Sequence, residues 1–197
     1  MTAKEMKIKT FSLIEEYFPA LTGLAEDEDV LYKINGVINS IQMDLMPLRK
    51  LNAVKEIEIE DGDSNIVNLK TAITDLYQIK SIKFDDVIEY EMPDEITLVL
   101  PEGFIGTFKV YYYKLPSLMT LTFESPASSA AYDSTYTFEL DQVLLEIMPY
   151  GIAADLLKMD MISSYGKYFQ EEYMMRKNQV DSRMSSGQII FEGGLNV

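Results

Sequence analysis

The chain has 197 residues and is strongly acidic, with 32 Asp and Glu against 17 Lys and Arg and a formal net charge of −15. It contains neither cysteine nor histidine, which excludes disulfides, thiolate nucleophiles, sulfur-ligated metals and the usual general base. The negative charge opposes binding to nucleic acid, because phosphates are neutralised by Lys and Arg, although it is compatible with a wall that repels DNA.

Hydrophobic residues make up 47% of the chain and charged residues 25%, which is the balance of a folded globular protein. No apolar run approaches the roughly 20 residues that span a bilayer. Residues 1–10 alternate Lys with apolar residues and lack the continuous apolar core of a secretion signal. We therefore expect a protein that is made in the cytoplasm and does not contact a membrane.

The first elements are expected to be two helices. Apolar residues at helical spacing over residues 5–18, closed by Pro19, predict the first helix. The second has one apolar face, with Asp27 or Asp29 placed to cap its start and Pro47 to end it. Its apolar positions are Val30, Ile34, Val37, Ile38, Ile41 and Leu45.

Beyond Leu51 the apolar period changes to two, which predicts short strands. The turn Asp61-Gly62-Asp63 follows the first strand. Further strands are expected at residues 66–69, 79–84, 87–90, 96–100 and 107–114. Their close spacing is typical of an antiparallel sandwich or barrel. Residues 125–134 are small and polar and predict an exposed loop.

Helical spacing returns after Leu140, with Asp141 as N-cap. Pro149 and the nearby Gly151 predict a kink or break in this helix. A last helix is expected over residues 163–180, with Ser164 as a possible cap. Its aromatic residues are Tyr165, Tyr168, Phe169 and Tyr173.

The predicted fold class is α+β: a helical bundle formed by the N- and C-terminal helices, with an inserted antiparallel β-sandwich or barrel module and an extended C-terminal arm. The predicted boundaries are 1–52 for the N-terminal helices, 53–136 for the β-module, 137–182 for the C-terminal helices and 183–197 for the arm. The arm is predicted from its glycines and its isolated apolar run, which do not fit a compact core.

The carboxylate clusters do not form a recognisable catalytic or metal site. Residues 60–63 superficially resemble a calcium loop, but the ligand spacing fails and a solvated hairpin turn is favoured. A glycosidase needs only Asp and Glu, but such sites bring aromatic sugar platforms, and tryptophan is absent. Gly103 and Gly106 lack the continuation of a phosphate-binding loop. We expect no enzyme activity, cofactor or metal.

The run Tyr111-Tyr112-Tyr113 is the most conspicuous local feature. In a strand, Tyr111 and Tyr113 share one face and Tyr112 takes the other. A central strand packed on both sides is favoured. The alternative, a stacking surface for a ligand or single-stranded nucleic acid, lacks a basic groove in the sequence.

Several of these segments together resemble head–tail connector (adaptor or neck) proteins of tailed bacteriophages. The resemblance lies in the run from Tyr77 to Ile82, a strand ending at Leu100-Pro101, and the run from Gly106 to Pro116. It continues from Tyr136 to Asp141 and into the two C-terminal helices, through Ile147–Leu157, Tyr168-Phe169, Glu171, Glu172 and Tyr173. It covers residues 30–197. It lies in the order of these segments and in the general character of their residues, and it includes no catalytic signature.

The resemblance implies a structural virion protein at the neck, the head–tail interface. It implies a dodecameric ring that docks on the portal, continues the DNA channel and offers a platform to a downstream neck or tail protein, while genomic DNA passes without specific binding. The arm residues Ile189, Ile190 and Phe191 are then the expected anchors on the portal or a neighbouring subunit. Tyr168 and Tyr173 on the last helix are further expected partner contacts.

Two alternatives from other classes stay open. The first is a β-domain binding module of a phage structural protein, which recognises a carbohydrate or receptor through Tyr90 and the strand Tyr111–Tyr113. The second is a hydrolase that uses only carboxylates. The N-terminal Lys4, Lys7 and Lys9 have no assigned role in any of these interpretations.

Overall fold

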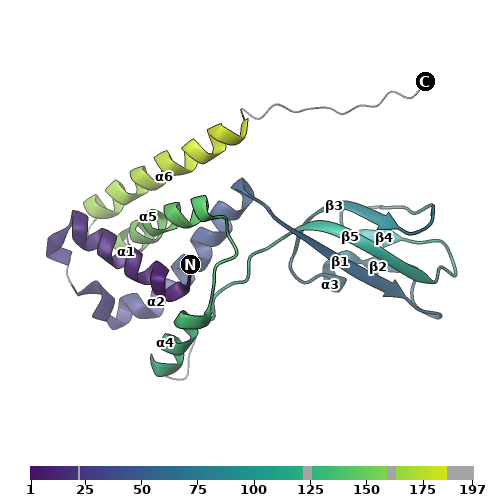
Figure 1. The fold of residues 1–197 in the computed structure, drawn as a ribbon, viewed down its shortest axis with the longest axis horizontal. Helices are drawn as coiled ribbons and strands as arrows, with labels where there is room; N and C mark the ends of the chain where they lie inside the picture. Colours follow the sequence, from purple (N-terminus) through teal and green to yellow (C-terminus); the bar gives the residue numbers. More distant parts are fainter. Residues whose placement is uncertain (22, 122–125, 159–162, 186–197) are drawn as a thin grey trace.

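The computed structural model describes residues 1–21, 23–121, 126–158 and 163–185, and in it a helical bundle and a β-module lie next to each other along the long axis (Figure 1). The bundle contains α1 (Ala3–Tyr17), α2 (Glu28–Leu45), α4 (Pro126–Thr135), α5 (Gln142–Lys158) and α6 (Ser163–Ser185). The β-module contains β1 (Leu51–Ile59), β2 (Ile66–Asn68), α3 (Leu69–Ala72), β3 (Leu76–Phe84), β4 (Thr97–Val99) and β5 (Gly106–Lys114). Short 3-10 turns at Pro19–Leu21, Leu24–Glu26 and Met46–Leu48 flank α2.

Side-chain caps begin the N-terminal helices. Thr2 and Glu5 form a capping box at the start of α1. The Asp27 carboxylate accepts hydrogen bonds from the backbone N–H groups of Asp29 and Val30, so Asp27 is the cap of α2. Both predicted helices are confirmed.

Helix α5 runs through the centre of the bundle and is buried on almost every side. Asp141 caps it, as predicted, by accepting from the N–H of Val143 at 2.9 Å. The helix continues unbroken through Pro149, so the predicted break is wrong. Packing against α1, α2 and α6 outweighs the cost of an internal proline, which is about 3 kcal/mol.

Helix α6 is longer than expected. It begins at Ser163 and ends at Ser185, so Ser164 lies inside the helix and does not cap it. Residues 183–185, which were assigned to the extended arm, are helical. The rest of the predicted arm lies outside the described residues.

The β-module consists of two small antiparallel sheets, one of three strands in the order β1-β5-β3 and one of two strands, β2-β4 (Figure 1). Leu69, Leu98, Phe108 and Val110 are buried in one core shared by both sheets. The described strands do not close into a barrel, and the predicted sandwich or barrel is not confirmed.

Three local predictions in the module have different outcomes. Residues 87–90 form no strand. The next residue, Glu91, forms a single isolated bridge with Val99 of β4. The predicted turn after β1 is confirmed, with Gly62 at φ +90°, a value that favours glycine. It is not a hairpin, since β1 pairs with β5 and β2 with β4.

The insertion is shorter than predicted and spans residues 51–114. Its first and last residues, Leu51 and Lys114, are register partners, so the chain leaves and re-enters the bundle at one place. The segment after β5 returns to the bundle: Met119 is buried in the bundle core, and both its backbone N–H and C=O bond to Asn39. The predicted boundary at residue 136 is therefore wrong.

Residues 126–135, expected as part of a loop, form helix α4 beside α1. Pro126 stands at the first helical position, which proline favours, and alanines follow it. Lys7, which had no assigned role, joins the two helices through a buried ion pair with Asp133 at 2.6 Å. This pairing between residues distant in sequence explains why α4 packs on the bundle.

Candidate functional site

The two predicted partner contacts on α6 lie in different environments. Tyr168 is half-buried in an aromatic cluster with Tyr17 and Phe18, at ring-centroid distances of 5.2 and 5.8 Å, and so ties α6 to the end of α1. Tyr173 is only 3% exposed, and its hydroxyl donates to the carboxylate of Asp44 on α2. Tyr173 thus belongs to the core of the bundle and offers little surface to a partner.

The predicted arm anchors Ile189, Ile190 and Phe191 lie outside the described residues. Their partner role stays a prediction that rests on the sequence.

The three tyrosines of β5 alternate as the sequence predicted. Tyr112 faces the module core, is 5% exposed and donates its hydroxyl to Asp75 at 2.9 Å. Burial raises the pKa of Tyr112 to about 12, and the Asp75 carboxylate adds to the shift. Tyr111 and Tyr113 face outward and are half-buried. The strand is central, but only its inner face is covered by a packed core.

The outward face carries lysines above the tyrosine rings. The Nζ atoms of Lys50 and Lys80 lie 4.8 and 5.1 Å from the ring centroid of Tyr113, and that of Lys83 lies 5.2 Å from the centroid of Tyr111. We call this set of five residues the tyrosine–lysine face. Basic groups therefore surround these tyrosines, contrary to the sequence-based expectation.

Neither the order of residues nor their spacing could have revealed this face. Lys50 precedes β1, Lys80 and Lys83 are on β3, and the tyrosines are on β5. Their proximity depends on the strand order and on a register with bulges in β3. Only the alternation within β5 was readable in the sequence.

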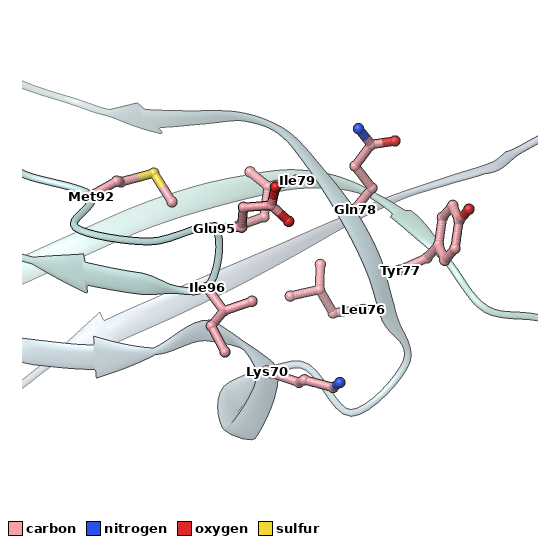
Figure 2. Close-up of a pocket in the computed structure, with 8 residues that line it drawn as sticks. All are labelled: Lys70, Leu76, Tyr77, Gln78, Ile79, Met92, Glu95 and Ile96. Atoms are coloured by element: carbon pink, nitrogen blue, oxygen red, sulfur yellow. The ribbon is translucent and has the colours of Figure 1, made fainter.

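A groove of about 480 Å³ opens along the free edge of β3, between the two sheets (Figure 2). Leu76 and Ile96 point towards each other across it, and the Tyr77 ring points away (Figure 2). The other lining residues are Lys70, Gln78, Ile79, Met92 and Glu95. An apolar floor beside an unpaired strand edge fits an extended segment or a small apolar group.

A second hollow, of about 450 Å³, lies on the outer side of α2. Tyr32 and Leu121, which are 74% and 56% exposed, line it together with Gly36 and Val37. We call this surface the α2 hollow. Large exposed apolar side chains around a hollow are typical of a protein–protein contact.

Within the described parts of the chain, no group of three or more Asp and Glu residues is placed to hold a metal ion. The resemblance of residues 60–63 to a calcium loop has a simpler basis, since the Asp63 carboxylate accepts from the N–H of Glu60 and closes the turn. In the same described parts, no helix is long and apolar enough to cross a membrane.

Comparison of this chain with protein-family models and with curated protein sequences gives no match. The expected resemblance to phage connector proteins therefore rests only on the sequence segments named in the sequence analysis.

Proposed function

We propose that this protein is a non-enzymatic structural component of a virion, a head–tail adaptor that forms a dodecameric ring, docks on the portal and continues the DNA channel toward the tail. The observation that carries the proposal is the α2 hollow. Tyr32 projects from the bundle beside a recess that a side chain of a neighbouring copy can fill. A closed ring repeats one contact between two different surfaces of the subunit, and we propose that the α2 hollow is one of these two surfaces.

The charge of the chain supports the same proposal. A formal net charge of −15 keeps free subunits apart and soluble before assembly. In a ring, the same charge gives a channel wall that repels DNA phosphates and lets the genome slide.

The division into bundle and β-module also supports it. An adaptor meets a portal on one side and a neck or tail protein on the other, and the two parts offer different surfaces at the two ends of the long axis (Figure 1). We propose further that the two small sheets act as an incomplete sandwich around their shared core.

The test is native mass spectrometry of the full chain, alone and mixed with the portal protein of the same phage. We expect one closed ring and a ring–portal complex. Tyr32→Asp and Leu121→Asp should abolish the ring, whereas Val87→Asp, at a fully exposed position of the β-module, should leave it intact. A protein that stays monomeric at all concentrations and ignores the portal would overturn the proposal.

The groove along β3 favours a second candidate, a β-module that binds a carbohydrate or receptor segment. The tyrosines first considered for this role are divided: Tyr90 packs on Phe84 at 5.3 Å, at the core side of β3, whereas Tyr111 and Tyr113 face outward. A glycan array probed with the full chain tests this candidate. Loss of glycan binding in Lys70→Ala/Glu95→Ala, which changes two exposed residues of the groove, with the subunit number unchanged, would support it.

A further inference from the structure

Three lysines of the tyrosine–lysine face have no carboxylate partner among the described residues. Lys50 donates to the side-chain oxygen of Gln78 at 2.7 Å, and Lys80 donates to that of Asn52 at 2.8 Å. Lys83 lies over the Tyr111 ring. These three lysines stand together on one face in a chain with nearly twice as many acidic as basic residues.

The arrangement around Tyr113 favours an external anion. The Nζ atoms of Lys50 and Lys80 lie 4.8 and 5.1 Å from the centroid of one ring, so two positive charges stand beside Tyr113. Beside them is a hollow of about 580 Å³, lined by Lys50, Asn52 and Tyr113 together with Pro47, Leu48 and Arg49. Arg49 already pairs with Asp141 at 2.9 Å, so the lysines are the groups left to receive a carboxylate.

The chemistry of the face fits a protein better than a nucleic acid. Val54, which is 56% exposed, lies opposite Tyr111 in the register and adds apolar surface between the charges. Tyrosine-rich, partly apolar faces are characteristic of protein interfaces. The net charge of the chain opposes a polyphosphate partner.

The chain itself carries a matching acidic surface. Glu26, Glu28 and Asp29, at the start of α2, are exposed, and none forms an ion pair within the described residues. The far end of α2 leads into β1, and the helix has 18 residues, so its two ends are about 27 Å apart. The two surfaces therefore do not meet within one copy.

We infer that the tyrosine–lysine face binds the acidic start of α2 of a second copy of this chain. This inference rests on the proposed ring and names one of its contacts. A contact between two different surfaces of identical chains is the kind that closes a ring. Charge pairing at its centre would set the orientation of neighbouring subunits.

Charge exchange tests the inference with the full chain. Lys80→Glu/Lys83→Glu reverses one surface, and Glu26→Lys/Glu28→Lys reverses the other. Each variant alone should raise the concentration for half-assembly by about tenfold or more, because like charges then face each other. An equimolar mixture should restore the wild-type subunit number with both variants in equal amounts. Lys4→Glu/Lys70→Glu, which changes the net charge equally but lies off the face, should assemble as wild type.

The outcomes separate this inference from the proposed function. If wild type forms rings and Lys80→Glu/Lys83→Glu forms them equally well, the inference is wrong and the ring stands. If the mixture of variants fails to recover, the start of α2 is not the partner. If wild type forms no ring, the proposed function itself fails. A further experiment measures the fluorescence anisotropy of a labelled single-stranded oligonucleotide mixed with the full chain. If wild type binds the oligonucleotide and Lys80→Glu/Lys83→Glu does not, the face binds nucleic acid and the inference is wrong.

Discussion

The aromatic ring of Tyr173 lies against Gly151, where helix α6 packs on helix α5. A β-carbon at Gly151 would lie 2.9 Å from Cε2 of Tyr173, closer than such atoms normally approach, and 3.0 Å from Cδ1 of Ile41, which is also a tight contact. Glycine is required here by close packing between helices.

Gly151→Ala should lower the free energy of unfolding by about 1–3 kcal/mol, because the overpacked core outweighs the better helix propensity of alanine. Gly36→Ala is the matched control on α2. Its β-carbon would have Leu121 Cδ2 at 4.0 Å as nearest neighbour, so this variant should gain about 0.5–1 kcal/mol. Urea unfolding followed by circular dichroism measures both, and a shift of both variants in the same direction would contradict the packing argument.

The phenol of Tyr173 should make stability depend on alkaline pH. Burial raises the pKa of Tyr173, and its hydrogen bond to the Asp44 carboxylate raises it further. The unfolded chain loses this proton near pH 10 while the folded chain keeps it, so stability is complete below pH 10 and falls as the pH rises above it.

Tyr173→Phe should therefore show a shallower loss of unfolding free energy above pH 10 than wild type. Urea unfolding at several pH values between about 8 and 11 gives the comparison, since model tyrosine titrates near 10. Tyr32→Phe, at an exposed position, is the control and should follow wild type. Parallel curves for Tyr173→Phe and wild type would show that this phenol does not govern the alkaline transition.

Breaking the Lys7–Asp133 pair should be costly. The two side chains are 10% and 13% exposed, and Asp133 Oδ1 has no other hydrogen-bond partner among the described residues. Lys7→Met leaves a buried carboxylate without a counter-charge and should cost about 3 kcal/mol. The double variant Lys7→Met/Asp133→Leu should recover most of this loss. A double variant as unstable as the single one would mean that packing, and not the charge, is responsible.

Asn39 should hold the segment after β5 onto α2. Its amide donates to the Met119 carbonyl at 2.9 Å and accepts from the Met119 N–H at 2.7 Å. Asn39→Ala removes both bonds and should cost about 2 kcal/mol. Hydrogen exchange at the Met119 amide should accelerate, while the neighbouring exposed Ser40→Ala should change neither quantity. Unchanged hydrogen exchange at the Met119 amide in Asn39→Ala would show that these two hydrogen bonds do not hold the segment on α2.

The accuracy of the sequence-based predictions followed the range of the interactions involved. Asp141 was identified as a cap, and the cap of α2 was narrowed to Asp27 or Asp29, because a cap depends on neighbours two or three residues away. The helix at residues 126–135 was missed because its ion-pair partner on α1, Lys7, is distant in sequence. The break allowed for at Pro149 is absent for a similar reason, since the packing that tolerates this proline comes from three other helices.

The candidate surfaces were less predictable than the elements that carry them. Alternation placed Tyr111 and Tyr113 on one face, but their lysine neighbours depend on strand order and bulges that no local pattern encodes. Tyr173 was expected to contact a partner because of the resemblance to connector proteins, yet its ring packs against a glycine of α5.

The pairing of Leu51 with Lys114 also has a kinetic consequence. Strands β1 and β5 form an antiparallel pair whose open end is the junction with the bundle. Once this pair has formed, residues 51–114 form a closed loop, and its two ends are as close as neighbouring strands, about 4.8 Å apart. Bringing α2 and α5 together then costs only the loss of conformational entropy that closes a short loop, and not that of closing the whole stretch between them. The contacts between α2 and α5 join residues far apart in sequence. They can nevertheless form in two steps that each close only short loops, first within the β-module and then between the helices that adjoin its ends.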